Sequence, residues 1–316
     1  MESLRLRTSN FISSSLANRS IGSYKTALNR FLHFCNNFDI TPALNEDNYM
    51  LFASYLSDQV TGETIASYLS GLQYFAKLSG ATKSLKEMHL LHYTMRSIKK
   101  AKIVPPRPKR KPITTKNLHN ILRFLILSNM SSWEKKLYWS ACLLAFFGLM
   151  RSSEYCCKSR KTFVIDSTLC MTDISFTARG MVIRIRQSKT DVFGLGARVN
   201  IGFGQEPICP VKAMHEFIRA RGQASGPVYI FQDQSYLTRI QVRQLIVQAI
   251  PEVQNLNTHS FRIGGATALA QAGIPEYTIQ LVGRWASDCF KIYLRFPEEY
   301  TYNLSSRMSN DKDVSE

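Results

Sequence analysis

A proline-rich segment, AKIVPPRPKRKPITTK at residues 101–116, divides this chain into two parts. It holds four prolines and six basic residues, with no acidic residue. Proline lacks the N–H that a helix needs and fixes its own φ, so this density excludes a continuous helix and favours a stiff, extended connector. We therefore predict a first domain at residues 1–100, a linker at 101–113, and a second domain at 114–316 that includes a C-terminal tail.

The first part has helical periodicity from about residue 20 to residue 100. In SIGSYKTALNRFLHFCNNF, apolar residues recur three and four positions apart, which is typical of an amphipathic helix. The segments MLFASYLSDQV, GETIASYLSGLQYFAKLSG and HLLHYTMRSIKKAK repeat this character between short polar breaks. The pattern predicts a small bundle of about four helices.

The second part changes its period midway. It opens with TTKNLHNILRFLILS and the apolar run LYWSACLLAFFGLM, which is shorter than the roughly 20 residues of a membrane span and predicts a buried helix. Strand-like alternation then predicts three antiparallel strands near 171–177, 181–187 and 198–203. Further helices are expected near 210–221, 237–250 and 275–282. The predicted fold class is mainly α with a small antiparallel β-sheet: an N-terminal helical bundle and a mixed α+β second domain.

The charge balance indicates a polyanionic partner. The 316 residues are 45% apolar and 20% charged, as in globular proteins, and 40 Lys and Arg against 23 Asp and Glu give a net charge of +17. Such an excess attracts nucleic acid and gains from counterion release, without separating DNA from RNA. The basic linker could be a segment that lies along a phosphate backbone, a nuclear import signal or an ordinary solvated connector. Its basic residues are Lys102, Arg107, Lys109, Arg110 and Lys111.

Cysteine and histidine spacing predicts no structural metal. The seven cysteines form no CxxC pair, and the six histidines show no zinc spacing against them. Several cysteines lie in apolar stretches, where the reduced side chain behaves as a small hydrophobe. The N-terminus MESLRLRTSNFISSSLANRS lacks the apolar core of a secretory signal. We expect a reducing compartment, no secretion and no membrane partner.

Polar residues stand at the ends of several predicted elements. Arg151 follows the apolar run in GLMRSSEY, and Glu154 would share its helix face and orient its guanidinium if the helix continues. Lys189 lies in QSKTDVFGLG, between two strands. His259 and Arg262 open a helix in NTHSFRIGGATALAQAGI, where free backbone N–H groups favour a phosphate. Each residue also has an ordinary interpretation as a helix end or an exposed loop residue.

Two further positions complete the set. Thr258 is placed to cap the helix that His259 begins. Tyr293 lies in GRWASDCFKIYLR, nine residues after Arg284, in a short aromatic-rich helix or turn. A tyrosine in such a place is by default a packing residue, so only the order of all these motifs carries information.

That order resembles the tyrosine recombinase family, which includes Cre-like recombinases and phage integrases. The resemblance rests on Arg-x-x-Glu at the end of an apolar helix, Lys in a hairpin loop, His-x-x-Arg opening a helix, and Tyr about 30 residues later. It covers roughly residues 10–300. The stretches SKTDVFGLG, HSFRIGGATALAQAGI and GRWASDCFKIYLR are most similar to recombinases of eukaryotic Crypton- and DIRS-type mobile elements. The resemblance implies a SAM-like core-binding domain before a catalytic domain.

The resemblance also implies a chemistry: site-specific DNA strand exchange through a 3′-phosphotyrosyl intermediate, with no metal and no cofactor. Tyr293 would be the nucleophile that attacks the phosphorus. Arg151 and Arg262 would hold the non-bridging oxygens, because a guanidinium is planar, always charged and able to donate two hydrogen bonds at once. Lys189 would protonate the departing 5′-oxygen, and His259 would assist proton transfer or hydrogen-bond a phosphate oxygen.

One position departs from the family pattern. The family usually has His or Trp nine residues before the tyrosine, but here that count reaches Arg284, with Trp285 next to it. Both side chains are hydrogen-bond donors, so either Arg284 or Trp285 would fill this sixth position. Trp285 is slightly favoured because its ring can also pack against the wall of the site. Glu154 would support the site by orienting Arg151.

The implied partner is double-stranded DNA, bound by a homotetramer that assembles on two duplexes from a monomer or dimer. The location would be the nucleus in a eukaryote and the cytoplasm otherwise. Two alternatives remain. A type IB topoisomerase uses a similar residue set and would relax supercoils without a specific sequence. A domesticated recombinase would bind DNA without catalysis, and loss of a catalytic residue would mark it.

Overall fold

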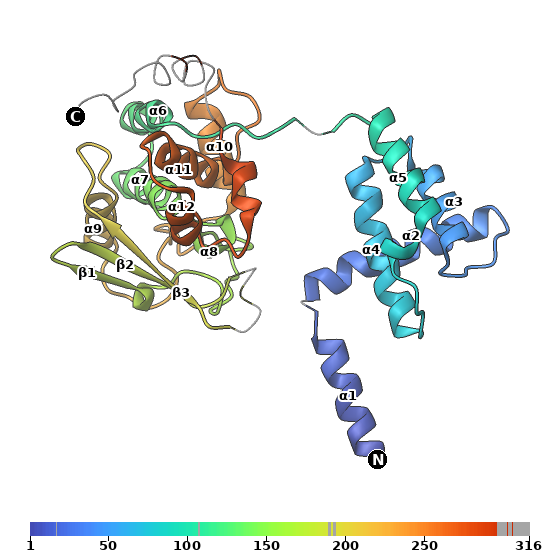
Figure 1. Ribbon diagram of the computed structural model, residues 1–316. Helices are drawn as coiled ribbons and strands as arrows, with labels where there is room; N and C mark the ends of the chain where they lie inside the picture. The colour runs from blue at the N-terminus through green and yellow to red at the C-terminus, as the bar shows by residue number, and fades with distance from the viewer. Residues whose placement is uncertain are drawn as a thin grey trace, which may run out of the picture. The chain divides into compact units, whose positions relative to one another are not determined.

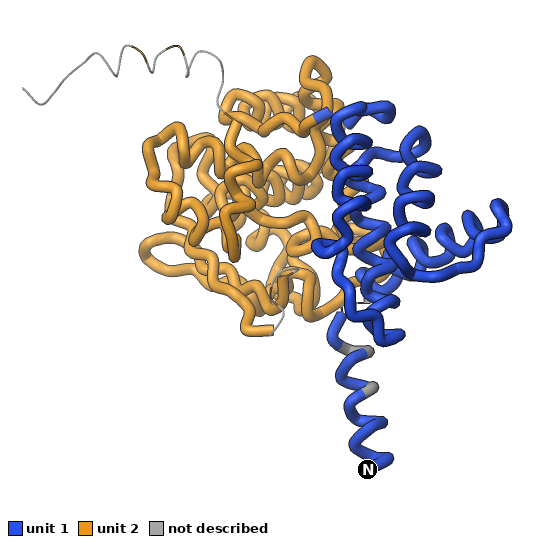
Figure 2. Tube along the Cα trace, turned by 45° about the vertical axis from the view of Figure 1, so that its right-hand side comes forward, with its two compact units in different colours: residues 1–108 blue, residues 109–316 orange. Residues whose placement is uncertain are grey.

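The computed structural model describes residues 1–16, 18–106, 108–188, 191, 194–295, 302 and 305. The chain forms two compact units, Met1–Pro108 and Lys109–Glu316 (Figures 1 and 2). Unit 1 is helical, and unit 2 combines helices with a three-stranded antiparallel sheet, which confirms the predicted fold class. None of the helices in the described ranges is both long and apolar enough to cross a membrane.

Unit 1 is built around aromatic side chains. Its helices are α1 (Glu2–Ser14), α2 (Asn18–Asn37), α3 (Glu46–Leu56), α4 (Gly62–Leu78) and α5 (His89–Ala101), with a 3-10 turn, η1, at Leu85–Glu87. The ring of Phe52 on α3 lies 5.4 Å from the rings of both Phe31 and Phe34 on α2. The four helices α2–α5 match the predicted bundle. The pattern does not predict α1, whose apolar side chains, such as Leu4 and Phe11, are exposed.

In unit 2 the helices begin where side chains cap them. They are α6 (Thr115–Leu127), α7 (Ser132–Phe147), α8 (Ser152–Tyr155), α9 (Pro210–Arg221), α10 (Arg239–Ala249), α11 (His259–Gln271) and α12 (Glu276–Gly283), with 3-10 turns η2 (Met171–Asp173) and η3 (Asp288–Tyr293). Thr114, Ser131 and Thr238 each close a capping box that fixes the start of α6, α7 or α10. The apolar run predicted as a buried helix is α7, which packs against α6, α9 and α11.

The sheet lies beside α9 (Figure 1). Its strands β1 (Ile174–Thr177), β2 (Gly180–Ile185) and β3 (Ala197–Gly202) follow each other in that order, all antiparallel, as predicted. Met181, Ile183 and Ile185 of β2 are buried, whereas Arg184 between them is exposed. This alternation gives the sheet one face that packs on the core.

A pair of glycines brings α11 against α7. A Cβ atom at Gly264 would overlap the backbone carbonyl of Ile113, and a Cβ at Gly265 would overlap that of Phe146. The Ile113 N–H also donates a hydrogen bond to the Ser260 carbonyl at 2.9 Å. These close approaches hold α11 against Ile113, just before α6, and against the C-terminal end of α7.

Replacing one of these glycines tests the packing. Gly264→Ala forces the Ile113 backbone to move and should destabilise unit 2 by about 1–3 kcal/mol, the usual cost of overpacking. Thermal and urea unfolding followed by circular dichroism would measure the loss. Gly202→Ala is the control, because the nearest atom to its added Cβ lies at an ordinary 3.8 Å. Equal stability of the two variants would contradict the close approach.

Candidate active site

The site is organised by the turn that follows α7. The condition for a shared helix face is not met: α7 ends at Phe147, before the expected end at Arg151, Leu149 has a φ of 44°, and Arg151 precedes the separate short helix α8. Glu154 nevertheless orients Arg151. Its carboxylate accepts the Arg151 backbone N–H at 2.8 Å and the Arg151 guanidinium at 3.1 Å. The contact is therefore a capping box and not a shared helix face.

A second arginine reaches the same carboxylate. Glu154 is only 3% exposed, and the Arg284 guanidinium donates to its Oε2 atom at 3.1 Å. Arg284 also donates to the carbonyls of Gly148 and Leu149, each at 3.1 Å. These carbonyls follow the C-terminal end of α7, where a helix favours positive charge. One buried carboxylate thus joins two guanidinium groups from different segments.

Arg262 lies deepest in this cluster, with 1% of its surface exposed. Its guanidinium donates to the carbonyl of Leu149 and, at 2.6 Å, to the carbonyl of Gly283. The Arg262 Cζ atom lies 4.1 Å from the ring centroid of Trp285, a cation–π contact. Gly283 is required here, because a Cβ at that position would overlap the Trp285 ring. Hydrogen bonds and an aromatic cover therefore fix the guanidinium.

Tyr293 is at the end of η3 and completes the group. Its ring lies 5.0 Å from the ring of His259 and 5.4 Å from that of Trp285. Thr267 of α11 anchors this segment: its hydroxyl donates to the Tyr293 carbonyl at 3.3 Å and accepts the Arg295 N–H at 3.1 Å. The helix that carries His259 and Arg262 therefore also positions the tyrosine.

The structure thus brings together most of the residues that the sequence singled out. They are Arg151, Glu154, His259, Arg262, Arg284, Trp285 and Tyr293. Lys189 lies outside the described residues. Thr258 does not cap α11 with its side chain; instead the Asn257 side-chain oxygen accepts the His259 N–H at 2.8 Å.

The electrostatics of the cluster favour an anion. Burial, with the nearby charges of Arg110, Arg262 and Arg151, lowers the pKa of His259 to about 4, so the imidazole is neutral at pH 7. Burial also lowers the pKa of Arg262 to about 9, and the charges of Arg151 and Arg284 act in the same direction. Glu154 opposes this shift but supplies only one negative charge. A bound anion would relieve the repulsion among these cations.

A basic hollow of about 340 Å³ lies beside His259. It is lined by Arg110, Ser152, Arg239, Ile240, Arg243, Asn257, Thr258 and His259. Arg239 and Arg243 are additional residues of this site that the motifs do not predict; the only sequence signal for them is a basic pair four residues apart in a predicted helix.

The linker residues differ in their surroundings. Among those predicted to contact DNA, Arg110 lines the hollow beside His259. Lys109 and Lys111 are exposed, Lys102 is the exposed residue that ends α5, and Arg107 lies outside the described residues.

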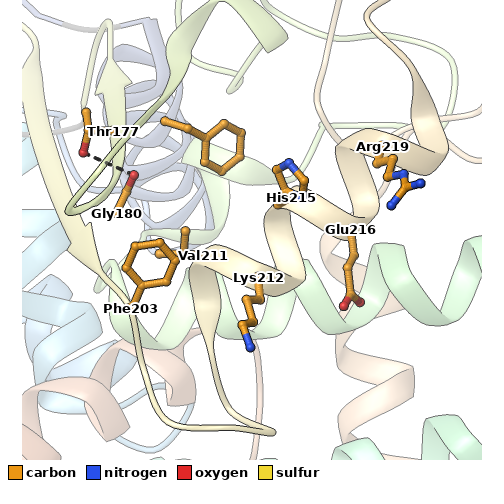
Figure 3. Close-up of a pocket in the computed structure, with 9 residues that line it drawn as sticks. Thr177, Gly180, Phe203, Val211, Lys212, His215, Glu216 and Arg219 are labelled. Carbon is orange, nitrogen blue, oxygen red and sulfur yellow. Dashed lines mark hydrogen bonds between the residues drawn. The ribbon is translucent and has the colours of Figure 1, made fainter.

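Another hollow, of about 410 Å³, lies between the β1–β2 turn and α9 (Figure 3). The Phe176 ring lies 5.6 Å from His215, and Lys212 pairs with Glu206 at 2.6 Å. Charges of both signs line or flank this hollow, and it shares no lining residue with the Glu154 cluster. Its chemistry does not favour a polyanion. Among the described residues, no group of three or more His, Cys, Asp or Glu side chains is placed to hold a metal ion.

Known proteins that are similar to this chain include an integrase/recombinase and several solved recombinase structures. No protein-family model matches the chain. The chain is 25% identical, over 333 residues, to an integrase/recombinase XerD homolog of Selenomonas ruminantium, and the match covers 98% of this chain and 91% of that protein.

Three solved structures share its fold. The XerH site-specific recombinase bound to a palindromic difH substrate has a TM-score of 0.62 and 15% identity, covering 92% of this chain and 79% of that one. A lambda integrase dimer bound to a COC′ core site has a TM-score of 0.55 and 12% identity, and the match covers 100% of this chain and 79% of that one. The Tn1549 transposon integrase with transposon right end DNA has a TM-score of 0.54 and 15% identity, and the match covers 84% of this chain and 85% of that one. The chain thus has the tyrosine recombinase fold.

The depressed pKa of His259 has a measurable consequence. Unfolding restores a pKa near 6.5, so the unfolded chain binds more protons between about pH 4 and 6.5. Stability should therefore be complete above about pH 6.5 and be lost as the pH falls towards 4. An NMR titration of labelled histidines, assigned with His259→Gln, would measure the pKa directly. Identical pH dependence of stability in the wild type and in His259→Gln would contradict the assignment.

Proposed function

We propose that this protein is a site-specific DNA recombinase that cuts and rejoins strands through a 3′-phosphotyrosyl intermediate. The observation that carries the proposal is the cluster of Arg151, Arg262 and Arg284 around Glu154, with Tyr293 and His259 ring to ring beside it. Concentrated positive charge in a largely buried site suits a phosphate whose negative charge grows as phosphorus becomes five-coordinate. The similarity to an integrase/recombinase over nearly the whole chain supports the same conclusion.

The reaction follows from these side chains. Arg151 and Arg262 hold the non-bridging oxygens while the Tyr293 phenol oxygen attacks phosphorus and the bond to the 5′-oxygen breaks. A bound phosphate offsets the cations that lower the pKa of His259, so His259 would then accept the phenol proton, and Lys189 would give a proton to the leaving 5′-oxygen. A 5′-hydroxyl from another strand reverses these steps. The phosphotyrosyl bond conserves the energy of the broken phosphodiester, so rejoining needs no ATP.

Double-stranded DNA is the proposed partner. The net charge of +17 and the basic hollow next to His259 would place a phosphate backbone alongside the cluster. The XerH, lambda integrase and Tn1549 integrase structures all hold DNA. Arg110, Arg239 and Arg243 are the side chains that we assign to this contact.

Finer assignments rest on the sequence motifs alone. We propose that the enzyme serves a mobile element, most similar to eukaryotic Crypton- and DIRS-type elements, and would then act in the nucleus. It would assemble as a homotetramer on two duplexes, with the tail after Tyr293 reaching a neighbouring subunit. Exchange between two defined sites would distinguish this activity from topoisomerase-like relaxation, and DNA binding without any covalent adduct would indicate a domesticated protein.

Removing the phenol oxygen tests the nucleophile. On a nicked duplex the short cleaved strand diffuses away and cannot rejoin, so the covalent adduct accumulates. Tyr293→Phe should abolish this adduct, because phenylalanine has no oxygen with which to attack phosphorus. Denaturing gels would score the adduct, and fluorescence anisotropy would score DNA binding, which should stay at the wild-type level. Tyr302→Phe is the matched control and should retain the adduct. An undiminished adduct in Tyr293→Phe would rule out this residue as the nucleophile.

The hollow is tested by the salt dependence of binding. Arg239→Gln and Arg243→Gln should each weaken DNA binding similarly for all sequences and reduce the slope of log affinity against log salt by about 1, if each contacts one phosphate. Binding isotherms over a range of salt concentrations would measure the slope. Arg179→Gln, in the exposed β1–β2 turn, is the control. An unchanged slope would remove the two arginines from the DNA contact.

A further inference from the structure

We propose that Arg284 is a positioning residue that couples the segment carrying Tyr293 to the orientation of Arg151, acting through Glu154. The inference rests on the proposed function and adds a role that the family pattern does not provide. At this position the pattern places a donor to the phosphate. Here the side chain has become part of the protein framework.

The contacts of Arg284 support this role. Its guanidinium donates to the carbonyls of Gly148 and Leu149 and to the Glu154 carboxylate, each at 3.1 Å, and to the Val282 carbonyl at 3.3 Å. The side chain is 11% exposed. Both terminal nitrogens of the guanidinium thus donate to protein acceptors on the turn after α7 and on Glu154.

The backbone conformation of Arg284 is unusual for an arginine. Arg284 ends α12 in the left-handed region, with φ 57°. Helices that end in this way usually have glycine or asparagine there. An arginine carries a conformational cost at such a position, and its side chain offsets that cost by bridging the end of α7 and Glu154. The planar guanidinium places two nitrogens on acceptors at the end of α7 and on Glu154, whereas lysine has a single ammonium nitrogen.

The neighbouring residue extends the coupling. Trp285 covers the Arg262 guanidinium at 4.1 Å, and its ring lies 5.4 Å from Tyr293. Two consecutive side chains therefore fix two different guanidinium groups: Arg284 fixes Arg151 through Glu154, and Trp285 fixes Arg262 directly. When the segment from Gly283 to Tyr293 is seated, both arginines are held in place and the tyrosine lies beside them. A displaced segment would release both arginines.

A double-mutant cycle tests the coupling. The variants are Arg284→Met, Glu154→Gln and the pair together, with Lys291→Met as a control that removes surface ion pairs from the same segment. The readouts are the single-turnover rate of adduct formation on a nicked duplex and the DNA dissociation constant. Arg284→Met should slow the rate by about tenfold or more, with a nearly unchanged dissociation constant. The double variant should be no slower than the slower single variant, because both changes break one linkage.

The outcomes separate the possible roles. If the rate losses of Arg284→Met and Glu154→Gln multiply, Arg284 acts independently of Glu154, as a direct phosphate donor would, and the coupling is overturned. A wild-type rate in Arg284→Met also overturns it. Arg284→Lys keeps the charge but loses the fork, so full rescue by lysine would show that charge alone matters and would equally contradict positioning. Melting temperatures identify any variant that has merely lost its fold, and Arg284→Lys then replaces Arg284→Met in the cycle.

A measurement without strand cleavage keeps this inference separate from the proposed function. If the wild type forms no adduct, the recombinase proposal fails, and titration with inorganic phosphate then decides the role of Arg284. Phosphate binding should raise the pKa of His259 in the wild type, since an anion offsets the nearby cations. In Arg284→Lys the affinity for phosphate should fall by about tenfold because Arg151 is no longer held. Wild-type affinity in that variant would overturn the positioning role.

Discussion

A single buried carboxylate, Glu154, organises the charged cluster of unit 2. A charge removed from water is tolerated only when it is paired and hydrogen-bonded, and Glu154 meets this requirement with Arg151 on one side and Arg284 on the other. The same two arginines belong to segments more than a hundred residues apart in the sequence. The ion pairs therefore join the turn after α7 to the end of α12, beside the first turn of α11 that carries Arg262.

The cluster carries more positive than negative charge, which explains its chemistry better than any single residue does. Arg262 is held by two carbonyls and covered by Trp285, in surroundings where electrostatic interactions are strong. Burial first, and then the repulsion among the neighbouring cations, lowers its pKa and that of His259. A phosphodiester would supply the missing negative charge. Preorganised positive charge of this kind stabilises a transition state in which the phosphate becomes more negative.

Much of the fold could be predicted from sequence periodicity. The strands, the buried helix α7 and the four helices of unit 1 follow from apolar spacing, because that spacing directly reflects which faces are buried. The residue types that meet in the cluster were also readable from the order of the motifs. The break after Phe147 was not readable, since the apolar pattern runs on through Leu149 and Met150, and tertiary hydrogen bonds from Arg262 and Arg284 stabilise the turn.

The distinct environments of Arg284 and Trp285 were equally hidden from the sequence. Both side chains are donors, so composition cannot separate them, and only the folded chain shows Arg284 on backbone carbonyls and Trp285 over a guanidinium. Arg239 and Arg243 were overlooked because a basic pair on a helix is usually an ordinary solvated face. Their position next to His259 depends on how α10 and α11 pack, which no local pattern specifies.

The central claim is that this charged cluster directs the Tyr293 phenol to a DNA phosphate. Mass spectrometry of the peptide that remains attached to a nicked duplex after proteolysis tests it most directly. The account predicts one linkage, between Tyr293 and the 3′-phosphate of the cut strand. A linkage at another residue, such as Tyr302, or a duplex that is bound tightly yet never becomes attached, would contradict it.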